Sequence, residues 1–447
     1  MKLHSNKRIE IEHRRRLHMA RARATTRTGD NAVKIQRFAR AFRSRLAALA
    51  IGVATASLSL LAAGPAAAQD KPIKIGLTTD LTGIAAAYAR SQVNGVQLAV
   101  DQINASGGLL GRKLEVLVRD SQLKPDLGTS HTRDLITREN VDFLIGPDGS
   151  AVGMTVSAVA KQYKKVVMMT IPNSPRITTE TFHPYVFTVV PSGVMEARAM
   201  AAAIGPGNKR IAFIGGDYEA AHQGLKYFKD WLAKVNPSAE IVSEAWPKLG
   251  EPDYSSYITS LMSSKPDVIF SYLWGADLIG FVKQGKPYGV FTKTKVASLV
   301  FLDDLKALGD EMPDGVIAQM RAPFFALTGD RMTKFTEQFR AKYNDYPADW
   351  AIMGYEGMQI LAQAIKSANS LESDAIVKAV EQVKYDGLRG PISFRALDHQ
   401  GTVGSYIGTV AKSDKYPFKI LTNVKTISAE SIWPSEAEIT AARAAVK

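Results

Sequence analysis

Hydroxyl side chains stand at the ends of two apolar segments in this sequence, a position suited to hydrogen bonding with a ligand. Ser150 lies where an apolar segment gives way to a helical pattern. Its hydroxyl and the N–H groups of the helix start could hold a carboxylate, although the same hydroxyl could also cap its own helix, and the two roles are compatible. Ser174 follows the next apolar segment, in a loop stiffened by Pro172 and Pro175. These residues predict a binding site for a polar ligand.

Aromatic side chains occupy comparable loops. Trp274 follows an apolar segment, as a ring that stacks on a ligand would, although packing at a lobe interface explains its position equally well. Tyr88 and Tyr218 also lie in loops that follow apolar segments. We interpret the three rings as candidate ligand contacts.

Motifs that carry catalysis or bind metal are missing from the sequence. There is no Gly-x-x-x-x-Gly-Lys-Ser/Thr loop, no Gly-x-Ser-x-Gly elbow and no His-Glu-x-x-His pair. The absence of cysteine excludes disulfides, thiol catalysis and zinc–thiolate sites. The four histidines after residue 68 are scattered, without metal-ligand spacing: His131, His183, His222 and His399. We therefore expect a binding protein rather than an enzyme, with no cofactor and no metal.

The elements that position these residues follow from an alternation of short apolar segments with helical patterns. The first series predicts strands at 73–79, 114–118, 141–145 and 166–170. After a Pro-bounded extended segment, the alternation restarts, with strands expected at 210–214, 241–246, 267–272 and 295–301. Nearly continuous apolar strands alternating with helices indicate parallel sheets covered on both faces. The prediction is an α/β chain with two doubly wound parallel-sheet lobes.

The candidate side chains fall together in such a fold. Ligands of open α/β sheets bind beyond the carboxyl ends of the strands. The loops expected there include every candidate named above, and they cover residues 80–88, 146–153, 170–174, 215–222, 273–277 and 301–304. We expect these loops to face a cleft between the two lobes.

The positive charge of the chain is confined to its N-terminus. The formal net charge is +13, yet residues 69–447 contain 42 basic and 40 acidic side chains. The basic N-terminal segment runs into an uncharged apolar stretch at 46–68 that ends in Ala-Ala-Ala. This pattern predicts a secretory signal cleaved near Ala68 and a periplasmic product. An uncleaved helical anchor is the alternative, a nucleic-acid-binding arm is disfavoured by the apolar stretch, and a true start at Met19 or later would explain the long basic segment.

Three motifs resemble the opening of the leucine/isoleucine/valine-type periplasmic binding proteins of ABC transporters. They are KIGLTTDLTG at 74–83, GVQLAVDQIN at 95–104 and GGLLGRKL at 107–114, and the resemblance continues to about residue 424. It implies a type I periplasmic-binding-protein fold whose two lobes close on a small-molecule ligand and present it to ABC permease subunits. It also implies a monomer without nucleic-acid partners. Presentation of the ligand to a membrane sensory receptor is the alternative function.

The resemblance also implies how the chain divides. Residues 1–68 form the basic extension and signal peptide. Residues 69–188 with roughly 322–390 form the first lobe, and residues 189–321 with roughly 391–447 form the second, the C-terminal part being the less determined. The three segments of the hinge fall near 186–190, 318–321 and 390–394.

By the same resemblance, the ligand carboxylate is bound at Ser150 and at Asn173-Ser174, with aromatic contacts from Trp274 and Tyr88. Amino-acid binders of the family hold the ammonium group with an acid after the strand that matches 295–301.

Here the only acids in that region are Asp303 and Asp304, and Asp303 is the candidate. The aromatic residue expected shortly after Tyr218 is replaced by Ala220 or Ala221. The expected ligand is therefore a branched-chain amino acid or an aromatic or other carboxylic acid, and these departures favour the second class.

Overall fold

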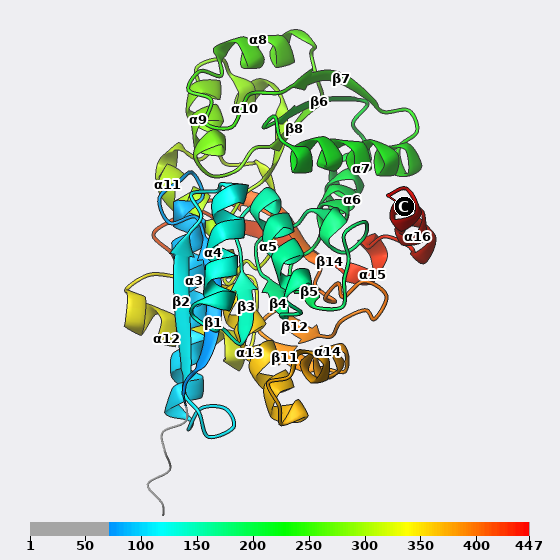
Figure 1. Ribbon diagram of the computed structural model, residues 1–447. Coiled ribbons are helices and arrows are strands. Elements are labelled where there is room, and N and C mark those ends of the chain that lie inside the picture. Colours follow the sequence, from blue (N-terminus) through cyan, green and yellow to red (C-terminus); the bar gives the residue numbers. More distant parts are fainter. Residues whose placement is uncertain (1–70, 447) are drawn as a thin grey trace, which may run out of the picture. The chain divides into compact units, whose positions relative to one another are not determined.

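The computed structural model describes residues 71–446, and the predicted signal segment with its cleavage point near Ala68 lies outside them. The strands form a five-stranded sheet, a seven-stranded sheet and a small two-stranded one (Figure 1). Within residues 71–446, no helix is both long enough and apolar enough to cross a membrane.

The first lobe is built on five parallel strands in the order β2-β1-β3-β4-β5. Side chains of β3 alternate between two apolar layers: Phe143 and Ile145 pack with α3 and α13, whereas Leu144 packs with α4 and α5. Helices therefore cover both faces of this sheet. The elements are β1 (Ile73–Thr79), β2 (Leu114–Asp120), β3 (Phe143–Gly146), β4 (Val167–Met169), β5 (Val186–Thr188), α3 (Ala86–Ala105), α4 (Pro125–Thr137), α5 (Ser150–Gln162) and α13 (Asp349–Ala368).

The second lobe is built on seven strands in the order β14-β13-β10-β9-β8-β6-β7. The five strands from β6 to β10 are parallel, whereas β13 and β14 add an antiparallel edge. The strands are β6 (Arg210–Gly215), β7 (Glu240–Ala245), β8 (Val268–Tyr272), β9 (Lys295–Leu299), β10 (Ile317–Met320), β13 (Ser405–Ala411) and β14 (Ile420–Ile427). The helices of this lobe are α6 (Gly193–Ile204), α7 (Glu219–Val235), α8 (Ser255–Ser263), α9 (Gly275–Gly285), α10 (Val290–Lys293) and α11 (Leu302–Leu308). Two wound lobes of this kind confirm the predicted fold class.

Helix α6 is an element that the sequence pattern did not predict. Ten of its twelve residues are buried, so its sequence, GVMEARAMAAAI, has no polar face to give it a helical period. The helices and strands that complete the chain are α12 (Asp330–Tyr343), α14 (Ser373–Glu381), β11 (Tyr385–Gly387), β12 (Gly390–Ile392), α15 (Ala429–Ile432) and α16 (Glu436–Ala444).

The chain passes between the two large sheets three times: after β5, after β10, and between β12 and β13. The first and third passages are hydrogen-bonded to each other. The N–H of Thr188 donates to the carbonyl of His399 at 3.2 Å, and the N–H of Gly401 donates to the carbonyl of Thr188 at 2.9 Å. The residue boundaries predicted for the lobes remain a prediction.

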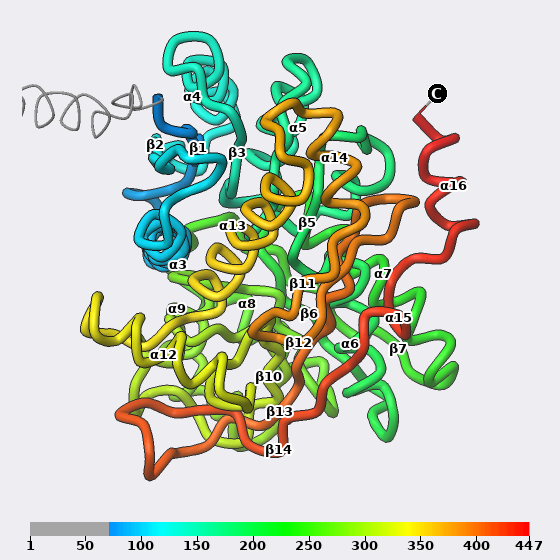
Figure 2. The backbone as a smooth tube through the Cα atoms, turned by 90° about the horizontal axis from the view of Figure 1, so that it is seen from below, coloured from blue at the N-terminus to red at the C-terminus, as the bar shows by residue number. Residues whose placement is uncertain are grey.

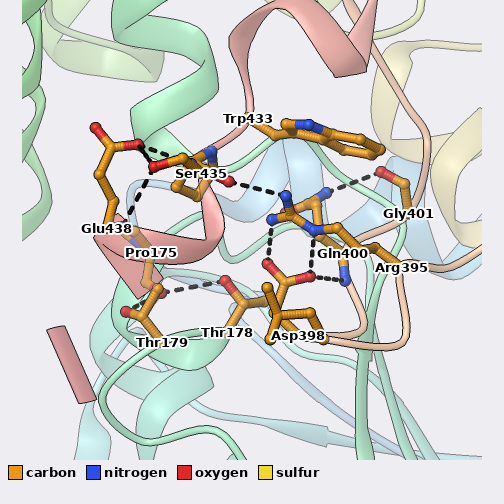
Figure 3. Close-up of polar contacts among 12 residues, drawn as sticks. Pro175, Thr178, Thr179, Arg395, Asp398, Gln400, Gly401, Trp433, Ser435 and Glu438 are labelled. Atoms are coloured by element: carbon orange, nitrogen blue, oxygen red, sulfur yellow. Dashed lines mark hydrogen bonds and ion pairs between the residues drawn. The ribbon is translucent and has the colours of Figure 1, made fainter. Parts of the chain in front are cut away.

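A C-terminal strap, defined as residues 429–444, lies along one side of the two lobes (Figure 2). Arg198 of α6 donates to the carbonyl of Trp433 at 2.7 Å, and Arg443 donates to the carbonyl of Leu397 at 2.8 Å. Arg395 donates to the carbonyl of Pro434 at 2.8 Å and stacks on the Trp433 ring (Figure 3). The strap therefore joins the second lobe to the loop that precedes β13.

Candidate functional site

A cavity of about 170 Å³ lies where the carboxyl ends of the two parallel sheets meet. For scale, a cavity of roughly 150 Å³ in another protein accepts benzene. Each of the six loops predicted to face the cleft contributes to the lining. The lining residues are Ala85, Tyr88, Leu123, Gly149, Ser150, Ala151, Val152, Ile171, Pro172, Asn173, Tyr218, Leu249, Tyr272, Trp274, Leu299, Phe301, Arg321 and Trp350.

The structure brings five of the seven predicted site residues to this cavity: Tyr88, Ser150, Asn173, Tyr218 and Trp274. The other two, Ser174 and Asp303, do not line it. Ser174 is buried directly before a short helical turn at Pro175–Ile177. Asp303 lies in the first turn of α11, where its carboxylate is 3.6 Å from the ammonium nitrogen of Lys306.

The first polar wall of the cavity is the N-terminus of α5. Residues 149–152 line the cavity there, and the first N–H groups of a helix have no partner inside it. The positive end of the helix dipole also favours an anion at this point. The hydroxyl of Ser150 donates to the side-chain oxygen of Asn173 at 3.2 Å, so in this structure it does not cap its own helix.

The second polar wall is an ion pair between Arg321, directly after β10, and Glu196 of α6. Arg321 Nε donates to Glu196 Oε1 at 2.6 Å, and Arg321 Nη2 donates to Glu196 Oε2 at 3.1 Å. The two side chains are 5% and 1% exposed. Burial acts to lower the pKa of Arg321, but the attraction of Glu196 outweighs it, so this pKa is raised. The pair is thus a buried, charged group at the edge of the cavity.

Tyr88 connects the two lobes across the cavity. From α3 of the first lobe, its hydroxyl donates to Asp304 Oδ1 at 2.7 Å and accepts from the N–H of Gly275 at 2.9 Å. Burial raises the pKa of Tyr88, and the neighbouring Asp304 raises it further. Burial also raises the pKa of Asp304 to about 7. Three more aromatic rings lie within 4.6–6.1 Å of the Tyr88 ring, centroid to centroid: Trp274, Phe301 and Trp350.

The lining formed by the described residues has unused hydrogen-bond donors and no carboxylate. Within residues 71–446, the Tyr272 hydroxyl and Trp350 Nε1 are buried without a hydrogen-bond partner. No Asp or Glu of the described chain lines the cavity directly. Glu196, which contacts two lining residues, already accepts from Arg321 through both oxygens and from Asn173 Nδ2 at 2.5 Å. A ligand of this cavity must therefore supply acceptors and an apolar body.

Sequence reasoning missed five residues of this site: Glu196, Tyr272, Phe301, Arg321 and Trp350. Tyr272 and Phe301 end predicted strands, so their position at a carboxyl end was a usable signal. Arg321 and Glu196 are 125 positions apart, and no local pattern joins them. Among the described residues, no group of three or more His, Asp or Glu could hold a metal ion.

Comparison with known proteins gives consistent matches along the chain. The family model described as "Periplasmic binding protein" matches residues 72–415. The "Leu/Ile/Val-binding protein homolog 4" of Brucella abortus is 24% identical over 410 residues, covering 85% of this chain and 95% of that protein.

Two solved structures illustrate the similarity of fold. A periplasmic binding protein from Burkholderia mallei has a TM-score of 0.75 at 23% identity and covers 82% of this chain and 97% of its own. A solute-binding protein of an ABC transporter from Rhodopseudomonas palustris, solved with 3,4-dihydroxy benzoic acid, has a TM-score of 0.73 at 23% identity and covers 80% and 98%. At these identities the likeness shows the fold alone.

Proposed function

The chain belongs to the periplasmic binding protein family, and from that premise we propose that it is the solute-binding component of an ABC importer whose ligand is a small aromatic carboxylate without an ammonium group. It captures this ligand between its two lobes in the periplasm and presents it to a permease. It performs no chemistry on the ligand.

One observation carries the choice of ligand: the cavity lining that the structure describes has unused hydrogen-bond donors but no carboxylate to pair with an ammonium group. An α-ammonium group needs acceptors, and burying an unpaired cation is costly. The lining of the described chain contains no carboxylate; beside it, Glu196 already accepts from Arg321 and Asn173, and Asp304 accepts from Tyr88. A carboxylate, in contrast, finds donors at the N-terminus of α5. This difference favours an organic acid over an amino acid.

The apolar part of the lining supports an aromatic body. Six aromatic side chains line the cavity: Tyr88, Tyr218, Tyr272, Trp274, Phe301 and Trp350. Rings in offset or edge-on contact add about 0.5–1.5 kcal/mol per pair beyond burial of area. A cavity volume of about 170 Å³ also suits one ring with small substituents.

Contacts from both lobes support capture by closure. Tyr88, Ser150 and Asn173 come from the first lobe, whereas Tyr218, Trp274 and Arg321 come from the second. A ligand shifts an open–closed equilibrium only by its different affinity for the two states. A ligand that contacts both walls only when the lobes are closed binds the closed state more tightly and therefore favours it.

The test is thermal unfolding of the chain from residue 69 to 447 against a panel of ligands. Benzoate and ring-substituted benzoates are expected to raise the melting temperature, since a ligand at a hundred times its Kd adds about 2.7 kcal/mol of stability. Leucine, isoleucine and phenylalanine are expected to leave it unchanged. A shift with leucine and none with aromatic acids would show that the ligand class is wrong.

The matched control is Ser150→Ala, which removes a hydroxyl from the carboxylate wall and leaves the aromatic lining in place. We expect it to reduce the shift produced by every aromatic acid to a similar degree.

A further inference from the structure

We infer that the Arg321–Glu196 pair forms a second recognition point in the cavity, and that it receives an uncharged oxygen carried by the ligand at a distance from its carboxylate. A phenolic hydroxyl, a methoxy oxygen or a carbonyl oxygen on the ring has this chemistry. The inference rests on the proposed function and narrows its ligand class to oxygen-substituted aromatic monocarboxylates.

Arg321, a residue of the cavity lining, has N–H donors that no hydrogen bond within the described residues uses. A guanidinium group carries five N–H donors. Three of them are used, by Glu196 Oε1 at 2.6 Å, Glu196 Oε2 at 3.1 Å and the carbonyl of Ile171 at 2.8 Å. Two remain, on a side chain that lines the cavity within 5.1 Å of the Trp350 ring and 5.6 Å of the Phe301 ring.

A buried hydroxyl lies close to the same point. Tyr272 is 1% exposed, lines the cavity, and has no partner for its hydroxyl among the described residues. A Cβ atom placed on Gly193, one turn before Glu196, would lie 3.6 Å from this hydroxyl and 3.4 Å from the carbonyl oxygen of Asn173. The Tyr272 hydroxyl thus belongs to the wall that holds Glu196, and it adds a third unused donor there.

The charge of the pair decides what it accepts. Glu196 already neutralises Arg321, so a second carboxylate at this point would face a buried like charge without a counter-ion of its own. A further acid lies beside this point, since Asp349 Oδ1 accepts from the backbone N–H of Arg321 at 3.0 Å. An ammonium group would face the guanidinium. An uncharged oxygen accepts from the unused donors without either penalty.

The spacing of the two polar walls fits one ring. Asn173 joins them, because its Oδ1 accepts from Ser150 at 3.2 Å and its Nδ2 donates to Glu196 at 2.5 Å. The walls are therefore separated by one amide side chain and two hydrogen bonds. A benzene ring with substituents in meta or para relation spans a similar length.

The experiment measures Kd values of the wild-type chain by calorimetry for benzoate, for meta- and para-hydroxybenzoate, and for the matched dianions isophthalate and terephthalate. The better hydroxybenzoate is expected to bind at least tenfold more tightly than benzoate, and both dianions at least tenfold more weakly than that hydroxybenzoate. Equal affinity for benzoate and both hydroxybenzoates, or a dianion as the tightest ligand, would overturn the inference. Binding of leucine with no aromatic acid bound would instead overturn the proposed function.

Two variants test which wall of the cavity causes the difference in affinity between hydroxybenzoates and dianions. Glu196→Gln removes the neutralising charge, so the affinity ratio of the better dianion to the better hydroxybenzoate is expected to rise at least tenfold. Ser150→Ala is expected to weaken all five ligands without changing their order. An unchanged ratio in Glu196→Gln would contradict the assignment, and the wild-type comparison decides the matter even where that variant folds poorly.

Discussion

Two arginines in this molecule, Arg321 buried and Arg395 partly buried, make nearly the same contacts in different surroundings. Arg321 Nε donates to Glu196 at 2.6 Å and its Nη1 to a backbone carbonyl at 2.8 Å. Arg395 Nε donates to Asp398 at 2.8 Å and its Nη1 to a backbone carbonyl at 2.8 Å. Each guanidinium also lies over a tryptophan ring, at 5.1 Å from Trp350 and 4.4 Å from Trp433 respectively.

The two arginines differ in what lies against the rest of the guanidinium group. Arg321 lines a cavity between the lobes, whereas Arg395 is covered by the C-terminal strap and its partner Asp398 is fully buried. The same local chemistry therefore faces a ligand cavity in one place and, in the other, fixes the strap to the segment that connects β12 with β13. The lesson is that the role of a buried ion pair follows from whether it meets a cavity, and not from its own geometry.

The largest expected effect comes from removing the acid of each pair. Asp398→Asn removes the fully buried counter-ion of Arg395, whose own side chain is 16% exposed, and breaking a buried pair costs about 3–5 kcal/mol of unfolding free energy. Glu196→Gln costs a similar amount, but an aromatic dianion bound beside Arg321 is expected to restore part of it. Urea unfolding with and without terephthalate measures both. If terephthalate restored the same unfolding free energy in both variants, Arg321 would not differ from Arg395 in its access to a ligand.

A second expectation concerns pH, because carboxyl groups beside the cavity have raised pKa values. Burial, followed by repulsion from Asp80, raises the pKa of Asp148 to about 7. The folded state then holds a proton that the unfolded chain releases near its ordinary pKa of about 4. Stability from this group is complete below pH 4 and is lost as the pH rises through about 7, at roughly 1.4 kcal/mol per unit of pKa difference.

Asp148→Asn tests this expectation, since it should flatten the decline of the melting temperature between pH 4 and pH 8. The exposed Asp310 provides the matched control, because Asp310→Asn should leave the wild-type slope in place. A wild-type melting temperature that rises steadily from pH 4 to pH 8, with no flattening in Asp148→Asn, would contradict the role of this carboxyl.

A third, smaller effect is expected from Tyr88→Phe. The variant keeps the ring but removes the hydroxyl that joins the first lobe to Asp304 and Gly275 of the second. Loss of a buried hydrogen bond costs about 1–1.5 kcal/mol, which corresponds to about a tenfold weaker affinity. Titration with the tightest aromatic acid measures it.

Tyr185→Phe is the control for this prediction, because its hydroxyl bonds to Asp374 at 2.9 Å within the first lobe, away from the cavity lining. Its affinity should match that of the wild type. A similar loss in both variants would show that Tyr88 has no special part in closure.

The smallest effect is expected at the strap surface. Glu438→Gln removes the ion pair with Arg198, which has a length of 2.6 Å, but the Glu438 side chain is 46% exposed. Pairs with one exposed partner contribute about 0.5 kcal/mol, so the melting temperature should fall by only about one degree. Ligand affinity should not change. A fall as large as that of Asp398→Asn would mean that the strap depends on its exposed pairs as well as on its buried ones.

Much of the fold could be predicted from the sequence because the strands of both sheets are short apolar segments between helical patterns. Helix α6 was not predicted, because a helix with ten of its twelve residues buried lacks a polar face that would reveal its period. The site residues divide in the same way, into those that a local sequence pattern could place and those that it could not. Ser150 and Trp274 follow strands and could be placed at the cavity from local pattern alone.

Arg321 and Glu196 could not be placed in this way, because their pairing depends on how α6 packs beside β10 over a long interval of sequence. Asp303 shows the opposite case: its local position suggested a ligand contact, but it pairs with Lys306 in the first turn of α11 instead.

The position of the strap in the sequence also affects when this part of the fold can form during synthesis. A chain is made from its first residue to its last, and the groups that cover Arg395 are the Pro434 carbonyl and the Trp433 ring, close to the end. The third passage between the lobes therefore lacks this cover until residues 433 and 434 have been made, after every strand of the two large sheets.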